Sequence, residues 1–172
     1  MIHLNIGSNL VSKYGDRFEN IRVAIDLLIK SKIKIIKISN FYETPSYPNN
    51  KLPPFLNVGV IAHYENNEIS LLNKISLIEK KIGRIRLKKN EPRVCDVDII
   101  DFNGQVIDSP KLKIPHPKCH LRNFVLYPII EIDDEWIHPI LKKNVKFLID
   151  NLDQKFRNEI TRLIKDVIIK YD

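Results

Sequence analysis

Two aspartates stand one residue apart in a stretch that otherwise has the pattern of a buried strand. The stretch is PRVCDVDIIDF, residues 92–102, and the aspartates are Asp96 and Asp98. Strand side chains two positions apart share a face and lie roughly 6–7 Å from each other. Two carboxylates held in this way repel unless a cation lies between them, and hard oxygen ligands beside a phosphate suit Mg²⁺. The alternative is a solvated pair that interacts with lysines, because so short a motif is weak by itself.

A basic segment leads directly into this strand. It reads GRIRLKKNEPR, and its basic residues are Arg84, Arg86, Lys88, Lys89 and Arg93. Arginine forks fit phosphate oxygens with two hydrogen bonds, so a basic loop beside paired carboxylates predicts a site for a metal and a polyphosphate. The alternative is nonspecific binding to a nucleic-acid backbone. The sequence lacks the aromatic-interleaved strands that are typical of an RNA platform on which bases stack.

A third polar block, IPHPKCHLRNF, contains histidines and a further arginine. We expect His116 to donate to phosphate, in a neutral or charged form, and Arg122 to add a cation. Cys119 and His120 would also suit zinc together with His116. A segment broken by prolines and without a second cysteine pair argues against a zinc site.

An aromatic turn, FYETPSYPNNKLPPFLN, precedes a predicted strand. Tyr47 and Phe55 supply flat apolar faces, and Asn57 supplies an amide. Such a set suits a planar heterocycle, because stacking holds the ring and the amide reads its edge. The alternative places Phe55 in the core and Asn57 at a strand edge.

Hydrophobic periodicity predicts the elements that position these residues. We expect helices over 16–31, capped by Asp16, and over 70–83, capped by Ser70 and ended by Gly83. The predicted strands cover residues 2–8, 34–45, 55–65 and 94–102. The order βαββαβ predicts an α+β, ferredoxin-like fold: an antiparallel sheet with both helices on one face.

The aspartates should then lie on the open face of the sheet, because Cys95, Val97 and Ile99 would face the helices. Asn103-Gly104 predicts a hairpin that adds residues 105–108 to the sheet edge. Two further segments, 123–132 and 145–169, are expected to be helical and to form a C-terminal extension.

The composition limits the class of protein. A chain of 172 residues favours one domain, residues 1–172, and 44% hydrophobic with 28% charged residues indicates a globular chain. No apolar run reaches the roughly 20 residues of a membrane span. The N-terminus has no secretion pattern, so we expect a cytoplasmic protein with Cys95 and Cys119 as free thiols. A net charge of +7 favours anionic partners such as nucleotides.

These motifs together resemble one known family, the 6-hydroxymethyl-7,8-dihydropterin pyrophosphokinases of the folate pathway. The resemblance runs from about residue 2 to about 132, which leaves 133–172 as the extension. It is carried, in order, by GSN at 7–9, FYETP at 41–45, FLN at 55–57, PRVCDVDII at 92–100 and PHPKCHLRNFVL at 115–126.

The resemblance implies a ferredoxin-like enzyme that transfers the pyrophosphoryl group of ATP to the hydroxymethyl oxygen of the dihydropterin and releases AMP. It implies two Mg²⁺ ions held by Asp96 and Asp98. The expected partners are therefore the two small substrates, with no nucleic acid and no membrane, and we expect a monomer. A nucleic-acid-binding module and a homologue that binds pterin without transfer remain the alternatives.

The resemblance also implies a role for each matching position. Catalytic-loop and phosphate positions are Arg84, Arg86, Arg93, His116 and Arg122. Pterin positions are Thr44, Pro45, Ser46, Tyr47, Phe55, Asn57, Asp96 and Phe124, with Phe55 and Phe124 on opposite faces of the ring. Nucleotide base and ribose positions are Glu79, Ile99, Lys111, Leu112 and Lys113.

Overall fold

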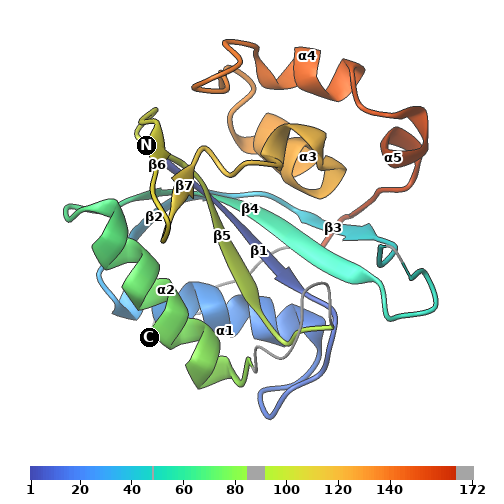
Figure 1. Cartoon of the computed structure of the whole chain (residues 1–172). Coiled ribbons are helices and arrows are strands. Elements are labelled where there is room, and N and C mark those ends of the chain that lie inside the picture. The colour runs from blue at the N-terminus through green and yellow to red at the C-terminus, as the bar shows by residue number, and fades with distance from the viewer. Residues whose placement is uncertain (48, 85–91, 166–172) are drawn as a thin grey trace.

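An antiparallel sheet passes through the middle of the molecule and has helices on both of its faces (Figure 1). The computed structural model describes residues 1–47, 49–84 and 92–165. Within these residues six strands form the sheet in the order β5-β1-β4-β3-β8, with β2 also paired to β4, and β6 and β7 form a second sheet. The elements are β1 (Ile2–Ser8), α1 (Arg17–Lys30), β2 (Lys34–Ile38), β3 (Phe41–Thr44), β4 (Phe55–His63), α2 (Glu68–Ile82), β5 (Asp96–Phe102), β6 (Ile107–Asp108), β7 (Lys113–Ile114), a 3₁₀ turn (Cys119–Leu121), α3 (Asn123–Ile132), α4 (Val145–Asp150), α5 (Gln154–Asn158) and β8 (Thr161–Leu163).

Helices α1 and α2 lie together on one face of the sheet, as predicted (Figure 1). The Asp16 carboxylate accepts hydrogen bonds from two N–H groups of the first turn, which confirms it as the cap of α1. The predicted cap at Ser70 is wrong. Helix α2 begins at Glu68 because the Asn67 side chain accepts the Ser70 N–H at 2.9 Å. Gly83 ends α2 with a φ of 111°, as predicted.

A large apolar core fills the space between the sheet and these two helices. Strand β5 contributes Val97 and Ile99, which are 6% and 5% exposed. Because side chains alternate along a strand, Asp96 and Asp98 face the other side of the sheet. The predicted orientation of the aspartates is therefore confirmed. The helices contribute Ile21, Ala24, Ile25 and Leu28 from α1 and Leu71, Ile75, Ile78 and Ile82 from α2.

The face that carries the aspartates is not open along its whole length, and that part of the prediction is wrong. Helix α3 packs on this face, over β4, and α4 lies outside it (Figure 1). Ile100 joins a second apolar core here, together with Val125, Leu126, Ile129, Trp136, Val145 and Leu148. Gly59 permits the close approach of α3, because a Cβ at this position would lie 2.8 Å from Cβ of Pro128.

The predicted strand over 34–45 is divided into β2 and β3. Both pair with β4, and the break falls at Ser39, which is 2% exposed. The Ser39 hydroxyl accepts the Gly59 N–H at 2.9 Å and donates to the Asn40 carbonyl at 2.8 Å. The Ser39 hydroxyl thus replaces a backbone acceptor for the Gly59 N–H, a competition typical of serine, whereas the Ser39 N–H still donates to the Gly59 carbonyl at 3.0 Å.

A tight turn forms at Asn103-Gly104, but the predicted hairpin is wrong, because residues 105–108 do not pair with β5. Both residues have positive φ angles, 56° and 69°, as a tight hairpin turn requires. Beyond the turn, Ile107 in β6 pairs with Ile114 in β7. Ile114 is 1% exposed in the first core, so β6 pairs with a buried strand other than β5.

The prediction of a helix over 145–169 is wrong in its second half. The segment contains two short helices, α4 and α5, and then β8, which pairs with β3 so that Phe41 lies opposite Leu163. The pairing satisfies the backbone groups of an otherwise free sheet edge. Residues 166–169 lie outside the described part of the chain.

Among the described residues, no helix combines the length and apolar character that a membrane crossing needs.

The contact between Gly59 and Pro128 gives a test of the fold. We expect Gly59→Ala to lower the free energy of unfolding by about 1–3 kcal/mol, because the added methyl group overlaps the backbone side of α3. Urea denaturation measures this change. The matched control is Gly104→Asn, where a Cβ meets nothing within 4 Å and asparagine tolerates the positive φ, so stability should change little. Equal stability of both variants would contradict the packing described here.

Candidate active site

Three neighbouring strands place the polar residues in one row. Gly7 of β1 lies directly opposite Asn57 of β4 on one side and Asp96 of β5 on the other. Because residues that face each other across an antiparallel sheet point to the same side, Asn57 and Asp96 flank Gly7 on one surface. A Cβ at Gly7 would lie 2.8 Å from Oδ1 of Asn57, so the Asn57 amide leans over the glycine. The row provides an amide, which lies over the buried Gly7, and a carboxylate.

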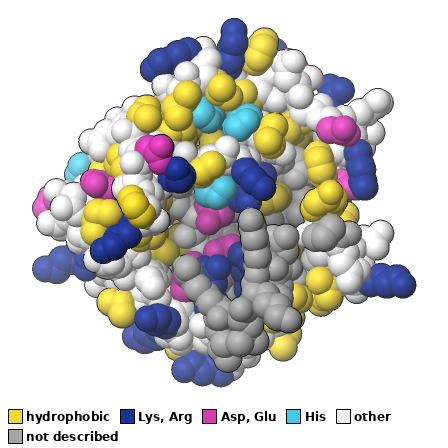
Figure 2. Space-filling view, viewed as in Figure 1, with side chains coloured by type: hydrophobic (Ala, Val, Ile, Leu, Met, Phe, Trp, Pro, Cys, Tyr) yellow, Lys and Arg dark blue, Asp and Glu magenta, His cyan; other side chains and the backbone are white. Residues whose placement is uncertain are grey.

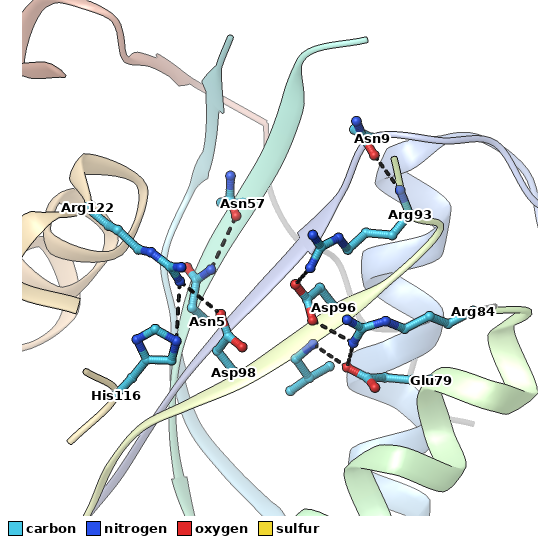
Figure 3. Close-up of polar contacts among 11 residues, drawn as sticks. Asn5, Asn9, Asn57, Glu79, Arg84, Arg93, Asp96, Asp98, His116 and Arg122 are labelled. Carbon is cyan, nitrogen blue, oxygen red and sulfur yellow. Dashed lines mark hydrogen bonds and ion pairs between the residues drawn. The ribbon is translucent and has the colours of Figure 1, made fainter. Parts of the chain in front are cut away.

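The next row repeats this arrangement with different side chains. Asn5 of β1 lies opposite Gly59 of β4 and Asp98 of β5. The Gly59 end is closed by α3, as described above. The Asp98 end is nearer to the surface, with 27% of its side chain exposed. Figure 3 shows Asn5 between Asn57 and Asp98.

Two arginines neutralise Asp96 in the ligand-free protein. One oxygen lies 2.6 Å from Nη1 of Arg84, and the other pairs with Arg93 (Figure 3). Burial by itself would lower the pKa of Arg84, but the charges of Asp96 and Glu79 outweigh it and raise that pKa above its ordinary value. Arg84 therefore remains charged.

The buried carboxylate of Glu79 holds Arg84 in place by an ion pair. Its side chain is 2% exposed, pairs with Arg84 and accepts the backbone N–H of Val97 at 2.9 Å. A buried carboxylate needs this kind of compensation. Glu79 thus joins the end of α2 to the start of β5 and fixes the position from which Arg84 reaches Asp96.

Asp98 has less compensating positive charge than Asp96. Burial and then the neighbouring charge of Asp96 raise its pKa to about 7, and the Arg122 guanidinium, 3.5 Å away, only partly opposes them. A carboxyl group with so high a pKa gains from any cation brought beside it. The pair therefore fits a divalent cation held by oxygen ligands, which is the chemistry of a Mg²⁺ site.

His116 and Arg122 offer converging hydrogen-bond donors. Nδ1 of His116 accepts the Lys118 N–H at 3.2 Å, which leaves the proton of the neutral ring on Nε2. Nε2 lies 3.4 Å from Nη1 of Arg122, which is also a donor. Burial and the Arg122 charge lower the His116 pKa to about 4, so the ring is neutral near pH 7. Two donors directed at the same space suit a phosphate oxygen.

The space-filling view agrees with this arrangement. Acidic side chains lie at the bottom of a hollow, and histidine and basic side chains lie around it (Figure 2).

The aromatic positions divide into two groups. Phe55 and Phe124 are half-buried, and each has an arginine over its ring: Arg93 at 5.9 Å from the Phe55 centroid and Arg122 at 5.4 Å from the Phe124 centroid. Tyr47 is instead 71% exposed and contacts the edge of Phe156, at 6.0 Å between centroids. The arginines over the two phenylalanine rings also pair with Asp96 and Asp98, so both rings lie close to the carboxylates. The contact described for the Tyr47 ring is with Phe156 instead.

The turn between β3 and β4 is tied to the end of β1. Thr44 and Ser46 are buried and Pro45 is exposed. Nδ2 of Asn9 donates to the Pro53 carbonyl at 3.0 Å, and Oδ1 of Asn9 accepts the Arg93 N–H at 2.7 Å. Asn9 was not assigned a role from sequence, although it belongs to the GSN motif.

The residues predicted to hold the base and ribose lie in different environments. Ile99 is 5% exposed in the first core, so only its backbone faces away from the apolar interior. Lys111 is exposed, Leu112 packs against the first core, and Lys113 pairs with Asp108 on the second sheet. No contact described for these lysines joins them to the aspartates. Arg86 lies outside the described residues.

The alternative zinc set is not the one that the sequence suggested. Cys119 and His120 lie near His138, with candidate ligand atoms within 4.8 Å of one another, whereas His116 is not a member of this group. His138 could not be found from spacing, because only the fold brings it here. Its Nδ1 accepts the N–H groups of Ile140 and Leu141, both at 3.2 Å. Burial raises the Cys119 pKa to about 12, so the thiol is protonated. Cys119 is part of the second core, and His138 is buried beside it, with its ring centroid 5.7 Å from that of Trp136.

Comparison with known proteins identifies the family. The family model of 7,8-dihydro-6-hydroxymethylpterin-pyrophosphokinase (HPPK) matches residues 3–134. The 2-amino-4-hydroxy-6-hydroxymethyldihydropteridine pyrophosphokinase of Aquifex aeolicus is 37% identical over 84% of this chain and 88% of that protein. The folic acid synthesis protein fol1 of Pneumocystis carinii is 33% identical over 81% of this chain but only 18% of its own length. The chain belongs to the HPPK family.

A solved structure supports the fold. The wild-type HPPK-DHPS of Plasmodium falciparum superposes with a TM-score of 0.69 at 16% identity and covers 94% of this chain. The chain spans about half of that protein, 47% of its length.

The low pKa of His116 predicts a dependence of stability on pH. Its pKa of about 4 in the folded protein is below the ordinary histidine value of 6.5, so the unfolded chain binds the proton more readily. The stabilising effect of a neutral His116 is complete above pH 6.5 and is lost as the pH falls toward 4. Between pH 7 and pH 4, the free energy of unfolding of the wild type should fall by about 1–3 kcal/mol more than that of His116→Asn, because asparagine cannot titrate. Urea denaturation at both pH values measures the difference, and parallel losses would refute the assignment.

Proposed function

We propose that the chain transfers the pyrophosphoryl group of ATP to the hydroxymethyl oxygen of 6-hydroxymethyl-7,8-dihydropterin, giving the dihydropterin pyrophosphate and AMP in folate biosynthesis. Membership of the HPPK family supports this activity. The observation that carries the proposal is the Asp96–Asp98 pair on one face of β5. His116 and Arg122, which can donate to phosphate, and the buried Asn57 amide lie near this pair. The proposed partners are these two small substrates, acted on by a cytoplasmic monomer, with residues 133–172 in the same single domain.

Asp96 and Asp98 are the proposed ligands of two Mg²⁺ ions. Bound Mg²⁺ would neutralise phosphate oxygens and favour ionisation of the attacking hydroxyl group. The residues fit this role because Asp98 lacks full compensation for its charge, as its raised pKa shows. Binding of Asp98 to a cation would require its proton to leave at pH values below about 7.

Arg84 and Arg93 change partners in this proposal. Without ligands they pair with Asp96, and in the substrate complex they contact the phosphate oxygens instead. The exchange keeps each charge compensated throughout the cycle. Arg86, at a matching family position, is proposed to act with them.

His116 and Arg122 would hold other phosphate oxygens, because their donors already converge. A neutral His116 contributes a hydrogen bond, and Arg122 contributes charge. Both donors are in place before the substrate arrives, which lowers the cost of orienting them during transfer.

The pterin would lie beside the Asn57 amide, which covers Gly7 between Asn57 and Asp96. Phe55 and Phe124 would contact the faces of the ring, and Asn57 would read its edge. The remaining positions proposed around the ring are Thr44, Pro45, Ser46 and Tyr47. The base and ribose of ATP are assigned to Glu79, Ile99, Lys111, Leu112 and Lys113, with Ile99 acting through its backbone.

A single assay tests the activity. The protein is incubated with ATP, Mg²⁺ and 6-hydroxymethyl-7,8-dihydropterin, and AMP is quantified. AMP formation that needs both the pterin and the metal is the expected result. A homologue that only binds pterin would form no AMP. A nucleic-acid-binding module would instead bind RNA with a steep salt dependence and without magnesium.

Asp98→Ala tests the metal assignment. We expect kcat/KM to fall at least about 1,000-fold, because the variant lacks one of two carboxylates that hold the cations. The thermal midpoint should stay close to that of the wild type, since the variant removes a charge that burial destabilises. The control is Asp134→Asn, an exposed aspartate in the segment after α3, which should retain full activity. Wild-type turnover by a folded Asp98→Ala protein would rule out the assignment.

Arg84→Ala separates transition-state stabilisation from binding. We expect kcat to fall about 100-fold and the Kd for ATP to rise less than about fivefold, because the guanidinium must leave Asp96 before it contacts phosphate. Arg162→Ala is the control, because Arg162 lies on the edge strand β8 and pairs with Glu131 rather than with the aspartates. We expect this variant to keep the kcat of the wild type. Equal losses in kcat and in ATP binding would argue against a role specific to transfer.

A further inference from the structure

Two buried carboxamides lie side by side beneath the proposed pterin position. Asn5 and Asn57 are 4% and 3% exposed. Nδ2 of Asn5 donates to Oδ1 of Asn57 at 3.2 Å (Figure 3). The other two amide atoms, Oδ1 of Asn5 and Nδ2 of Asn57, are buried and have no hydrogen-bond partner among the described residues. Buried polar groups are nearly always hydrogen-bonded, so these two atoms require an explanation.

The number of free groups does not depend on how each amide is oriented. If both amides were turned over, Nδ2 of Asn57 would donate to Oδ1 of Asn5, and a donor of Asn5 and an acceptor of Asn57 would remain. In either orientation the pair offers one donor and one acceptor side by side. That pattern complements the edge of a planar heterocycle on which an acceptor stands beside an N–H group.

Other buried asparagines of the same region are fully engaged. Asn20, which is 0% exposed, donates to the Leu10 carbonyl at 2.8 Å and accepts from the Ser12 hydroxyl. Asn9 uses both ends of its amide between two loops, as described above. Asn20 and Asn9 are therefore satisfied within the protein, whereas the Asn5–Asn57 pair keeps one free donor and one free acceptor. Among the described buried side-chain atoms, Nδ1 of His3 and Nδ1 of His120 also have no hydrogen-bond partner.

The surroundings leave Asn5 little freedom. On one side, its partner across the sheet is Gly59, which α3 covers through Pro128. On the other side lies Asp98. Gly7, two residues along β1, provides no side chain, and the Asn57 amide leans over it. The hydrogen bond from Asn5 therefore reaches the Asn57 amide at the point where that amide lies over Gly7.

We propose that Asn5 is a positioning and specificity residue for the pterin. It fixes the Asn57 amide by a hydrogen bond and completes a donor–acceptor pair that reads the edge of the heterocycle. This inference rests on the proposed function, and it adds a residue that the pattern of motifs did not assign. The pterin would form a hydrogen bond with each of the two free amide groups. A ring without the matching edge would leave these groups buried and unpaired, and would therefore bind more weakly.

A double-mutant cycle tests the proposal with 6-hydroxymethylpterin as a fluorescent probe. Asn5→Leu keeps the size of the side chain and removes both polar groups. We expect the Kd for the probe to rise at least tenfold and the KM for ATP to change less than twofold. In an Asn57→Leu background, the same Asn5→Leu change should raise the Kd less than threefold, because Asn5 acts mainly through Asn57.

Ser39→Ala is the matched control. It removes a buried hydrogen bond to Gly59, the residue opposite Asn5, without touching the amide pair. It should lower the thermal midpoint and leave the Kd for the probe unchanged. If Asn5→Leu behaves in the same way, the role of Asn5 is structural and the proposal is overturned.

A second variant, Asn5→Ser, tests the proposal if Asn5→Leu folds poorly. Asn5→Ser retains one polar group, and we expect a smaller increase in Kd, about threefold to tenfold, with the ATP KM again unchanged. An unchanged Kd in Asn5→Ser would overturn the proposal by the same criterion. The AMP assay on the wild type separates the two levels: no AMP refutes the proposed function, whereas an active wild type with insensitive Asn5 variants refutes only this inference.

Discussion

The repulsion between two carboxylates on one face of β5 is the constraint on which the site depends. A strand cannot place Asp96 and Asp98 on the same side without holding them close, and burial makes their repulsion stronger. Among the described residues, three arginines from three places compensate the aspartates: Arg84 after α2, Arg93 before β5 and Arg122 before α3. Compensation is unequal, and Asp98 retains a pKa of about 7. The site is thus arranged to accept further positive charge next to Asp98.

The sheet supplies the precision that this arrangement needs. Because β1 lies between β4 and β5, one central strand sets the distance between the amide of Asn57 and the carboxylate of Asp96. Two glycines serve different purposes on this face. Gly7 leaves room for the Asn57 amide to lie over β1, and Gly59 lets α3 approach the sheet closely. The two cores hold the sheet rigid from both sides, so the polar rows cannot shift relative to each other.

Most groups of the site have a partner before any ligand binds. Glu79 has Arg84 and the Val97 N–H, and Asn9 has Arg93 and Pro53. The amides of Asn5 and Asn57 are an exception, because each keeps one free group, and Asp98 has a raised pKa although it pairs with Arg122. Unmet charge and unmet hydrogen bonds therefore mark where the phosphates and the pterin are proposed to bind.

The sequence by itself determined the order of the elements and the shared face of the aspartates, because periods of 2 and 3.6 and the Asp16 and Gly83 caps are local properties. It also located the carriers of the chemistry, through motifs that identify the family. The folded structure alone decided what covers the aspartate face, since α3 reaches it only through the long-range contact of Pro128 with Gly59. It decided that residues 161–163 become a strand, because the free edge of β3 overrides local helix preference. The folded structure also brings Asn5 next to Asn57 and His138 next to Cys119. Spacing along the chain cannot predict these contacts, because they depend on strand register and on the packing of distant segments.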